Sequence, residues 1–375
     1  MRYYIVSGEA SGDLHGAHLA RALAKLDPEA VLHGWGGEHM EAAEVTVEKH
    51  FRDLAFMGFV EVVRNLPAIY RNWRFIKQRL KSLKPDALIL IDYPGFNLRL
   101  ARWAHAQGIR VFYFISPQLW AWHTSRVKII RRCVERMYVI FPFEKDFYAK
   151  HGVEVEYHGH PLIDVIDGWR PSGPLSFEQQ LDPAHPLVAL LPGSRRQEIE
   201  RILPAMLEIV PHFPQCQFAV AGASGLDPAF YKPFLQNRAG VFLVHGQTYA
   251  LLSRSSAALV TSGTATLETA LLGVPQVVCY KAGNFSYRLA RMLVNPELKH
   301  IAIVNLIAGR TVVPELIQDD LNPNLLQHQL GLLFEPNHRQ EMLEGYALVR
   351  KLLGPPGAAN RVAESIVNRL KQKTG

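Results

Sequence analysis

Short apolar runs alternate with amphipathic segments along most of the chain. Apolar runs of this kind are typical of strands buried in a parallel sheet, whereas apolar positions every three or four residues are typical of covering helices. In the first half this pattern predicts strands at 3–7, 87–91, 111–115, 136–140 and 155–158. It predicts helices between them at 17–26, 98–107, 125–133 and 143–150.

A second alternating series follows in the other half. The predicted strands are 187–191, 217–221, 241–244, 257–261 and 276–280. The predicted helices are 198–210, 228–236, 248–253 and 264–272, with a separate amphipathic helix at 358–371. Two successive open α/β sheets account for this order with the fewest assumptions.

The stretch 164–186 between the two series is dense in Pro, Gly, Ser and Asp, which is typical of a linker or hinge. We therefore expect an α/β protein with two Rossmann-like open-sheet domains that face a cleft. The expected boundaries are 1–165 and 186–350, with a C-terminal segment, 351–375, whose helix would pack back on the first domain. In such folds ligands bind at the carboxyl ends of the strands, so the loops there carry the chemistry.

The loop after the strand at 187–191 combines Gly193, Ser194 and Arg195 and leads into a helix. Glycine permits close approach of a ligand to the backbone, and helix N-termini and arginine favour phosphate groups. This combination predicts a diphosphate site to which Arg196 would also contribute. The alternative is a solvated turn whose arginines only cap the helix.

A similar loop follows the strand at 257–261, where Ser262, Gly263 and Thr264 open a helix that carries Glu268. Glu268 lies about one turn into this helix, where its carboxylate could accept hydrogen bonds from ribose hydroxyls. The alternative is that Glu268 only compensates the helix dipole. Together the two loops favour a nucleotide diphosphate site.

Metal and cofactor signals are weak. The chain has no Asp-x-Asp pair, so arginine and helix dipoles would have to neutralise the diphosphate, and we expect neither a metal nor a cofactor. His15 and His18 share a helix face but lack a third ligand nearby. The glycine-rich loop 7–13 lacks both the dinucleotide fingerprint and a Gly-Lys-Ser/Thr sequence. Its Ser11, Gly12 and Asp13 are candidates for contact with a ligand across the cleft.

Two further strand ends of the first domain carry candidate residues. Asp92 directly follows the run 87–91, where a general base belongs, although it could equally cap the turn that follows. The loop after 111–115 carries Gln118, Trp120 and Trp122, which could line a sugar or acyl pocket or fill a wedge between domains.

The segment 59–84 combines apolar residues at helical spacing with basic ones, and Pro67 should divide it into two helices. It contains seven basic residues and one acidic residue, so its net charge is nearly equal to the formal charge of +7 of the whole chain. It can seat on anionic lipid or be a core helix with a solvated basic face. The candidate membrane-facing residues are Phe59, Val62, Val63, Leu66, Ile69, Arg71, Trp73, Arg74, Ile76 and Lys77.

Composition excludes several other classes. With 48% hydrophobic and 20% charged residues the chain is typical of a globular protein, and its first residues do not resemble a secretion signal. Cys133, Cys216 and Cys279 are too far apart for a disulfide framework or zinc site. The positive charge permits a nucleic-acid partner, but no recognised nucleic-acid motif accompanies it.

Taken as a set, these motifs resemble the lipid-A-disaccharide synthases. The matching stretches share their order with the family and are 7–13, 57–62, 91–97, 116–122, 191–195, 262–268 and 305–310. The resemblance implies a GT-B glycosyltransferase that joins UDP-2,3-diacylglucosamine to 2,3-diacylglucosamine 1-phosphate (lipid X). The products would be the β-1,6-linked disaccharide phosphate and UDP, in an inverting, metal-independent reaction.

The resemblance also implies roles for individual residues. Asp92 matches the aspartate thought to act as general base, and Arg195 matches an essential arginine near the UDP phosphates. Asn305 and Arg310 match a loop near the donor. The family works peripherally on the cytoplasmic face of the bacterial inner membrane, so we expect an anionic membrane surface and no nucleic acid as a partner. A homodimer is compatible with the resemblance.

Enzymes of the same architecture are the alternatives within this fold. A UDP-N-acetylglucosamine epimerase or the transferase of peptidoglycan precursors would share the nucleotide loops. The segment 59–84 argues against the soluble epimerase, and the Trp120/Trp122 loop argues against both, through the resemblance alone.

Overall fold

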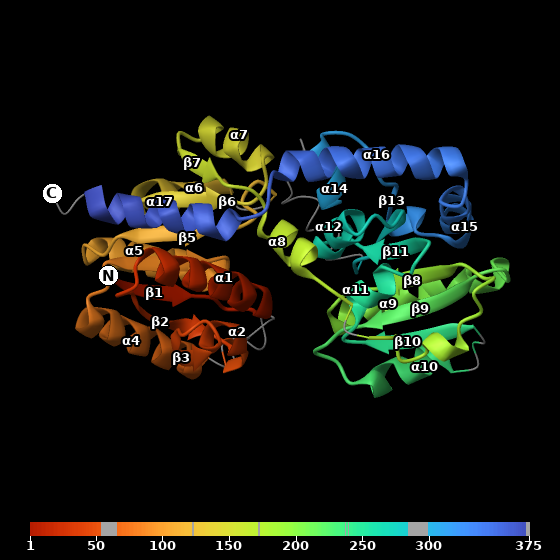
Figure 1. Ribbon diagram of the computed structural model, residues 1–375, viewed down its shortest axis with the longest axis horizontal. Coiled ribbons are helices and arrows are strands. Elements are labelled where there is room, and N and C mark those ends of the chain that lie inside the picture. The colour runs from red at the N-terminus through yellow and green to blue at the C-terminus, as the bar shows by residue number, and fades with distance from the viewer. Residues whose placement is uncertain are drawn as a thin grey trace. The chain divides into compact units, whose positions relative to one another are not determined.

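Each half of the chain forms a parallel sheet flanked by helices (Figure 1), which confirms the predicted α/β class with two open-sheet domains. The computed structural model describes residues 1–53, 66–121, 124–171, 173–236, 238, 240–283 and 299–372. The chain divides into unit 1, Met1–Asp164 with Gly354–Gly375, and unit 2, Val165–Leu353.

Unit 1 contains a sheet in the order β3-β2-β1-β4-β5-β6-β7, with all described pairs parallel. Its strands are β1 (Arg2–Val6), β2 (Val31–Gly36), β3 (Thr46–His50), β4 (Ala87–Ile91), β5 (Val111–Phe114), β6 (Arg136–Val139) and β7 (Val155–Tyr157). Its helices are α1 (Ala10–Leu26), α2 (Glu38–Glu41), α4 (Leu66–Leu83), α5 (Pro94–Ala106), α6 (Val127–Cys133), α7 (Phe143–Lys150) and α17 (Ala358–Gln372). Helix α8 (Pro161–Gly168) spans the boundary at Asp164.

Unit 2 contains a sheet in the order β10-β9-β8-β11-β12-β13, also parallel. Its strands are β8 (Leu187–Leu191), β9 (Gln217–Gly222), β10 (Val241–His245), β11 (Ala257–Thr261), β12 (Gln276–Tyr280) and β13 (Glu315–Ile317). Its helices are α9 (Arg196–Glu208), α10 (Lys232–Leu235), α11 (Thr248–Leu252), α12 (Thr264–Leu271), α14 (Ile303–Ala308), α15 (Pro323–Leu332) and α16 (Pro336–Leu353).

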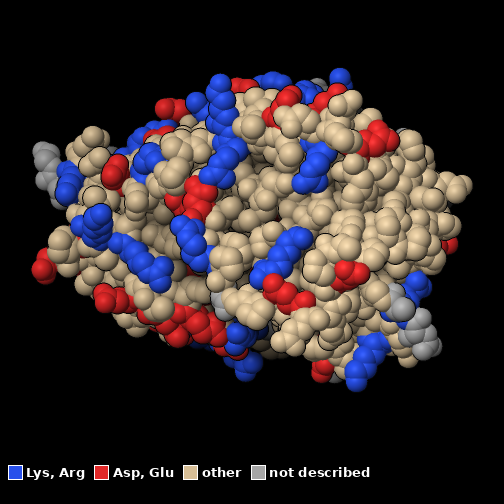
Figure 2. Space-filling model, turned by 45° about the vertical axis from the view of Figure 1, so that its right-hand side comes forward, with Lys and Arg blue, Asp and Glu red and all other residues tan. Residues whose placement is uncertain are grey.

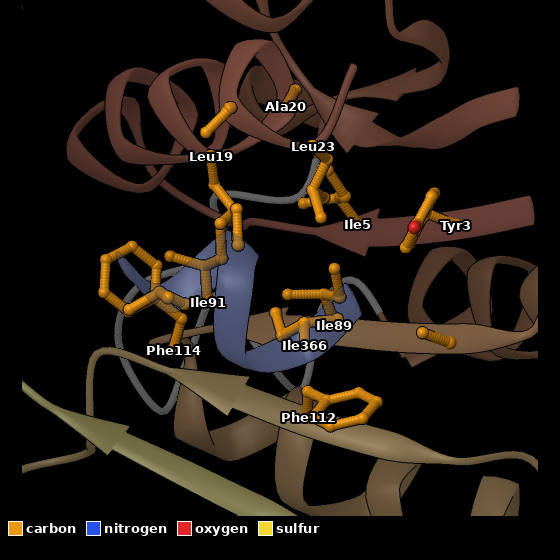
Figure 3. Close-up of a cluster of buried hydrophobic side chains, with 14 of the residues drawn as sticks. Tyr3, Ile5, Leu19, Ala20, Leu23, Ile89, Ile91, Phe112, Phe114 and Ile366 are labelled. Atoms are coloured by element: carbon orange, nitrogen blue, oxygen red, sulfur yellow. The ribbon is translucent and has the colours of Figure 1, made fainter. Parts of the chain in front are cut away.

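The alternation of side chains along each central strand builds two cores in unit 1. Tyr3 and Ile5 of β1 point to one face, where they pack with Leu19 and Leu23 of α1 (Figure 3). The next residues along β1, such as Tyr4, contribute to the opposite core. Successive strand residues face opposite sides, so a strand buried on both faces is apolar throughout. This is why these strands were recognisable in the sequence.

The C-terminal helix α17 belongs to unit 1 although more than three hundred residues separate it from α1 in the sequence. It packs beside α1 (Figure 1), and its Ile366 enters the same core as Ile5. Arg361 at its start donates hydrogen bonds to the carbonyl of His158, at 2.7 Å from Nη2.

All ten predicted strands are present, but the pattern missed three others. β2 and β3 carry glycine or charged residues, and β3 is a half-buried edge strand, so neither forms an apolar run. β13 is also an edge strand and has only three residues. The helix predicted at 228–236 is wrong in length: a 3₁₀ turn occupies Pro228–Tyr231 and α10 has four residues.

Candidate active site

The strand order of unit 2 reverses between β8 and β11, and the two predicted phosphate loops leave the carboxyl ends of these strands. This is the topological switch point, where open α/β sheets bind ligands. Gly193 has a φ of +118° and Gly263 a φ of +149°, which residues with a side chain rarely adopt. Each glycine thus permits the turn that leads from its strand into α9 or α12.

A pocket of about 750 Å³ opens at this switch point. Its lining includes seven of the nine predicted nucleotide-binding residues, namely Gly193, Ser194, Arg195, Ser262, Gly263, Thr264 and Glu268. The volume lies within the usual range for small-molecule sites, roughly 300–1,000 Å³. Tertiary structure therefore brings together two loops that lie about seventy residues apart in the sequence.

Part of the remaining lining was not predicted from the sequence motifs. It comes from Trp169 and from the loops that end β9 and β10, at 221–225 and 246–250. Both loops contain glycine at a strand end, which is the feature that could have identified them. Trp169 meets the Tyr249 ring edge-on, with ring centroids 6.1 Å apart.

Glu268 is the acidic group of this pocket. The hydroxyl of Tyr249 donates a hydrogen bond to its Oε1 at 2.7 Å. Burial raises the pKa of Glu268 above its ordinary value, and the Tyr249 hydrogen bond acts in the opposite direction. The carboxyl group is therefore oriented by a neighbour and retains an oxygen that can accept a hydrogen bond from a ligand hydroxyl.

The two adjacent arginines point to different surroundings. Arg195 lines the pocket, is mostly exposed, and lies 3.3 Å from Glu198 Oε1. The guanidinium of Arg196 instead lies over the Phe230 ring at 4.4 Å from its centroid, and Arg196 is not among the described residues that line the pocket. The expectation that Arg196 also contributes to the diphosphate site is therefore wrong, whereas the role of Arg195 stays a prediction.

Asn305 and Arg310 lie outside the described lining of the pocket. Asn305 is fully buried, and its Oδ1 accepts hydrogen bonds from the N–H groups of Val312 and Val313. Its Nδ2 donates to Glu315 Oε1 at 2.7 Å. The predicted contact with the nucleotide is thus wrong for Asn305, because its amide is used to shape the loop after α14. Arg310 is exposed in that loop.

In unit 1 the strand order reverses between β1 and β4, and Asp92 follows β4 at that point. Asp92 has a φ of +42° and Tyr93 a φ of +49°, a left-handed backbone that costs roughly 1–2 kcal/mol per non-glycine residue. Burial raises the pKa of Asp92 to about 6, with a further contribution from the charge of Glu9, and the Tyr93 N–H opposes both. A carboxylate with this pKa is ionised at neutral pH and suited to general base catalysis.

The loop 7–13 supports this strand end mainly through packing. Gly8 lies against the Tyr93 ring, where an added Cβ would come within 2.4 Å of a ring carbon. Asp13 is fully buried and accepts hydrogen bonds from the N–H groups of Gly37 and His39. Contact between Asp13 and a ligand is therefore a wrong prediction, because its carboxylate holds the start of α2.

Gly12 is also buried, and an added Cβ would lie 3.0 Å from Ser7 Cβ, so it serves close packing of α1 on the sheet and not ligand contact. Ser11 is exposed in the first turn of α1.

The aromatic loop after β5 is partly buried. Trp120 is 7% exposed and meets the Phe143 ring edge-on at 5.1 Å, so it packs inside unit 1 instead of lining an open pocket. Gln118 is exposed beside it, and Trp122 lies outside the described residues. Glu144 faces this loop from α7, and burial raises its pKa to about 8.

Helix α4 is the described part of the basic aromatic segment, with Pro67 in its first turn. Phe59, Val62 and Val63 lie outside the described residues, as does the side chain of Leu66. Ile76 is fully buried in the core of unit 1, so the expectation that it faces lipid is wrong.

Two other candidates on α4 are also turned toward the protein. Trp73 packs against the same core, and the Lys77 amine lies 5.5 Å from the ring centroids of both Trp73 and Trp103. Ile69 is half-buried, whereas Arg71 and Arg74 are exposed as expected. Tyr70 and Phe75, 62% and 43% exposed, are the large apolar side chains that the outer face of α4 presents.

Three further features concern surface charge, metal-ligand groups and helix hydrophobicity. On the face drawn in Figure 2, Lys and Arg side chains are interspersed with Asp and Glu. Among the described residues, no three His, Cys, Asp or Glu side chains are grouped to hold a metal ion. Within the same residues no helix is long and apolar enough to cross a bilayer.

Comparison with known sequences identifies one family. A family model described as lipid-A-disaccharide synthetase matches residues 3–359. The chain is 42% identical to the lipid-A-disaccharide synthase of Syntrophus aciditrophicus, over 98% of this chain and 97% of that protein. It is 40% identical to the synthase of Geobacter metallireducens, over 99% of this chain and 98% of that protein.

Comparison with solved structures finds the same fold in proteins of low sequence identity. The Staphylococcus aureus MnaA–UDP structure has a TM-score of 0.70 at 11% identity, covering 99% of this chain and 97% of that one. The UDP-GlcNAc 2-epimerase of Neisseria meningitidis, bound to UDP-GlcNAc, has a TM-score of 0.63 at 15% identity, covering 98% and 100%. At these identities the likeness concerns the fold alone.

Proposed function

The chain belongs to the lipid-A-disaccharide synthase family, and from this premise we propose that its unit 2 pocket holds the UDP of the donor while Asp92 of unit 1 activates the acceptor. The protein is a glycosyltransferase of lipid A biosynthesis that condenses a UDP-sugar with lipid X.

The reaction is a single in-line displacement with inversion. Asp92 accepts the proton of the acceptor 6-hydroxyl as its oxygen attacks the anomeric carbon of UDP-2,3-diacylglucosamine from the face opposite UDP. The bond between the anomeric carbon and the diphosphate oxygen breaks, and UDP leaves with the electron pair. Arg195 and the N-termini of α9 and α12 stabilise the charge on the departing diphosphate, so that no metal is required.

The observation that carries the proposal is that predicted nucleotide-binding residues converge on one pocket in unit 2. Gly193, Arg195, Gly263 and Glu268 come from two loops and line one pocket at the switch point. Backbone N–H groups, an arginine and an oriented carboxyl group are the partners that a nucleoside diphosphate needs for its phosphates and ribose. An epimerase would share this nucleotide pocket, but its likeness to the chain is limited to the fold, whereas the sequence matches show the synthase family.

The direct test is a turnover assay with purified protein, UDP-2,3-diacylglucosamine and lipid X. We expect stoichiometric release of UDP and formation of a β-1,6-linked disaccharide phosphate, with the same rate after chelation of divalent metals. An α-linked product would contradict inversion, and loss of activity with chelator that returns on adding Mg²⁺ would contradict the metal-independent mechanism.

The raised pKa of Asp92 predicts the acid limb of the pH profile. Because the base must be ionised, kcat/KM should fall as the pH drops through about 6. Glu9→Gln should move this limb to lower pH, since the negative charge of Glu9 is one of the causes that raise the pKa of Asp92. Glu29→Gln makes the same charge change beyond the far end of α1 and should leave the limb unchanged. If Glu9→Gln leaves the acid limb unchanged, the limb reports the ionisation of a group other than Asp92.

Both substrates carry acyl chains, so we place the enzyme peripherally on the cytoplasmic face of the inner membrane. The exposed face of α4 supports this with Tyr70, Arg71, Arg74 and Phe75, an arrangement of aromatic and basic side chains that favours an anionic interface. Each basic residue near such a surface contributes about 1 kcal/mol of attraction.

The oligomeric state is a separate question. Light scattering with and without lipid would show whether the protein is a homodimer.

The membrane prediction can be measured by co-sedimentation with anionic liposomes. Arg71→Gln with Arg74→Gln should weaken binding roughly tenfold or more, because about 2 kcal/mol of attraction is lost. Tyr70→Ser with Phe75→Ser should also weaken it. As a matched control in unit 2, Leu325→Ser with Lys351→Gln removes an exposed apolar and a basic side chain and should have no effect. Equal binding by all variants would contradict docking through α4.

A further inference from the structure

The backbone directly after β4 adopts a conformation that non-glycine residues avoid. Asp92 and Tyr93 are consecutive and both have positive φ, at +42° and +49°. Such residues persist where the surrounding structure determines them strongly, and they cluster at functional sites. The contacts that hold this turn therefore determine where the Asp92 carboxylate lies.

Two buried side chains hold the carbonyl of Asp92. The hydroxyl of Tyr113, in β5, donates a hydrogen bond to it at 2.5 Å, and Nδ2 of Asn97, in α5, donates at 2.9 Å. Both side chains are fully buried. A backbone carbonyl oxygen has two lone pairs, so the two donors together satisfy the carbonyl of this left-handed turn.

Asn97 also connects the two strands on either side of the switch point. Its Nδ2 lies 3.2 Å from the carbonyl oxygen of Ile91 in β4 and 3.4 Å from that of Val6 in β1. Its own backbone N–H donates to the carbonyl of Tyr93 at 3.0 Å. With the amide reversed, Oδ1 would face three carbonyl oxygens, so electrostatics favours the observed orientation.

We infer that Tyr113 and Asn97 are positioning residues, which fix the left-handed turn at Asp92 and thereby aim its carboxylate at the acceptor hydroxyl. The inference rests on the proposed role of Asp92 as general base. Neither side chain is assigned a contact with a substrate, and both act only through Asp92. Small errors in the placement of a catalytic group have large effects on rate, because the base must lie within hydrogen-bond reach of the proton it removes.

Tyr113→Phe is the sharpest test, because it removes the hydroxyl and leaves the ring in the core. We expect kcat to fall about 10-fold or more, with KM for both substrates within threefold of wild type and the affinity for UDP unchanged. Tyr138→Phe in the adjacent strand β6 is the matched control, since it deletes a buried tyrosine hydroxyl that donates to Ser365 Oγ. It should retain wild-type kcat at a comparable melting temperature.

A double variant separates positioning from a general structural role. In an Asp92→Asn background, Tyr113→Phe should cause no further loss of the residual rate, because a residue that acts through the base has nothing left to position. Asn97→Asp places an oxygen against the three carbonyl groups and should reduce kcat at least as much as Tyr113→Phe. If Asn97→Asp fails to fold, the decision rests on Tyr113→Phe alone and in the Asp92→Asn background.

The outcomes distinguish this inference from the proposed function. Full activity of Asp92→Asn would overturn the base assignment itself. If Asp92→Asn is inactive but Tyr113→Phe keeps wild-type kcat, or if the two losses multiply in the double variant, positioning is wrong while the base assignment stands. A fall in kcat of equal size in Tyr138→Phe would likewise show a general effect on the core and overturn the inference.

Discussion

Asp92→Asn is expected to lower kcat about 10²–10⁴-fold, the usual contribution of a positioned general base. The amide keeps the size and shape of the carboxyl group but cannot accept the proton of the acceptor hydroxyl. The measurement is UDP release under saturating donor and lipid X. Because UDP is assigned to unit 2, the affinity for UDP measured by calorimetry should not change.

The matched control for this variant lies at the other end of the same strand. Asp86 precedes β4 and accepts a hydrogen bond from the Arg2 backbone N–H at 2.7 Å, which an asparagine can also accept. Asp86→Asn should therefore keep wild-type turnover. Wild-type turnover by Asp92→Asn, in a protein that folds and binds UDP, would remove Asp92 from the mechanism.

Arg195→Ala should have the second large effect, a loss of about 10²–10³-fold in kcat. The guanidinium lines the pocket and is assigned to the diphosphate, whose negative charge grows as the sugar bond breaks. Affinity for UDP should also fall, because the same charge is present in the product. Single-turnover rates and UDP titrations measure the two effects separately.

The adjacent residue provides the control. Arg196→Ala removes an equal charge from the next position, but that guanidinium lies over Phe230. Its kcat should remain within a few-fold of wild type. Equal losses in the two variants would mean that the general positive charge of this loop matters, and that Arg195 has no specific role.

The sequence predicted the strands of both sheets because their burial on two faces requires continuous apolar runs. It failed for β2, β3 and β13, where glycine, charged residues or shortness hide the strand. In helix α4 the helical spacing was visible, but Ile76, on the buried side, was assigned to the membrane. Periodicity identifies an apolar stripe and does not say whether protein or lipid covers it.

In the candidate site, too, the sequence predicted some features correctly and others wrongly. Gly193 and Gly263 were recognisable because each lies between a buried strand and a helix N-terminus, where a glycine permits close approach of a ligand to the backbone. Asp13 and Asn305 also lie in predicted ligand-binding motifs. Their side chains, however, accept hydrogen bonds from backbone N–H groups at the start of α2 and in the loop after α14. Only the folded chain shows which polar side chains already have partners.

The sequence by itself determined the family and the two-sheet class, because these depend on local pattern and motif order. It also predicted the strand ends at which we place the chemistry. Tertiary structure decided which residues meet. It joined the loops of Gly193 and Gly263 in one pocket, separated Arg195 from Arg196, and placed Tyr113 and Asn97 on the Asp92 carbonyl. These contacts arise from strand order and packing between segments distant along the chain, which no local pattern records.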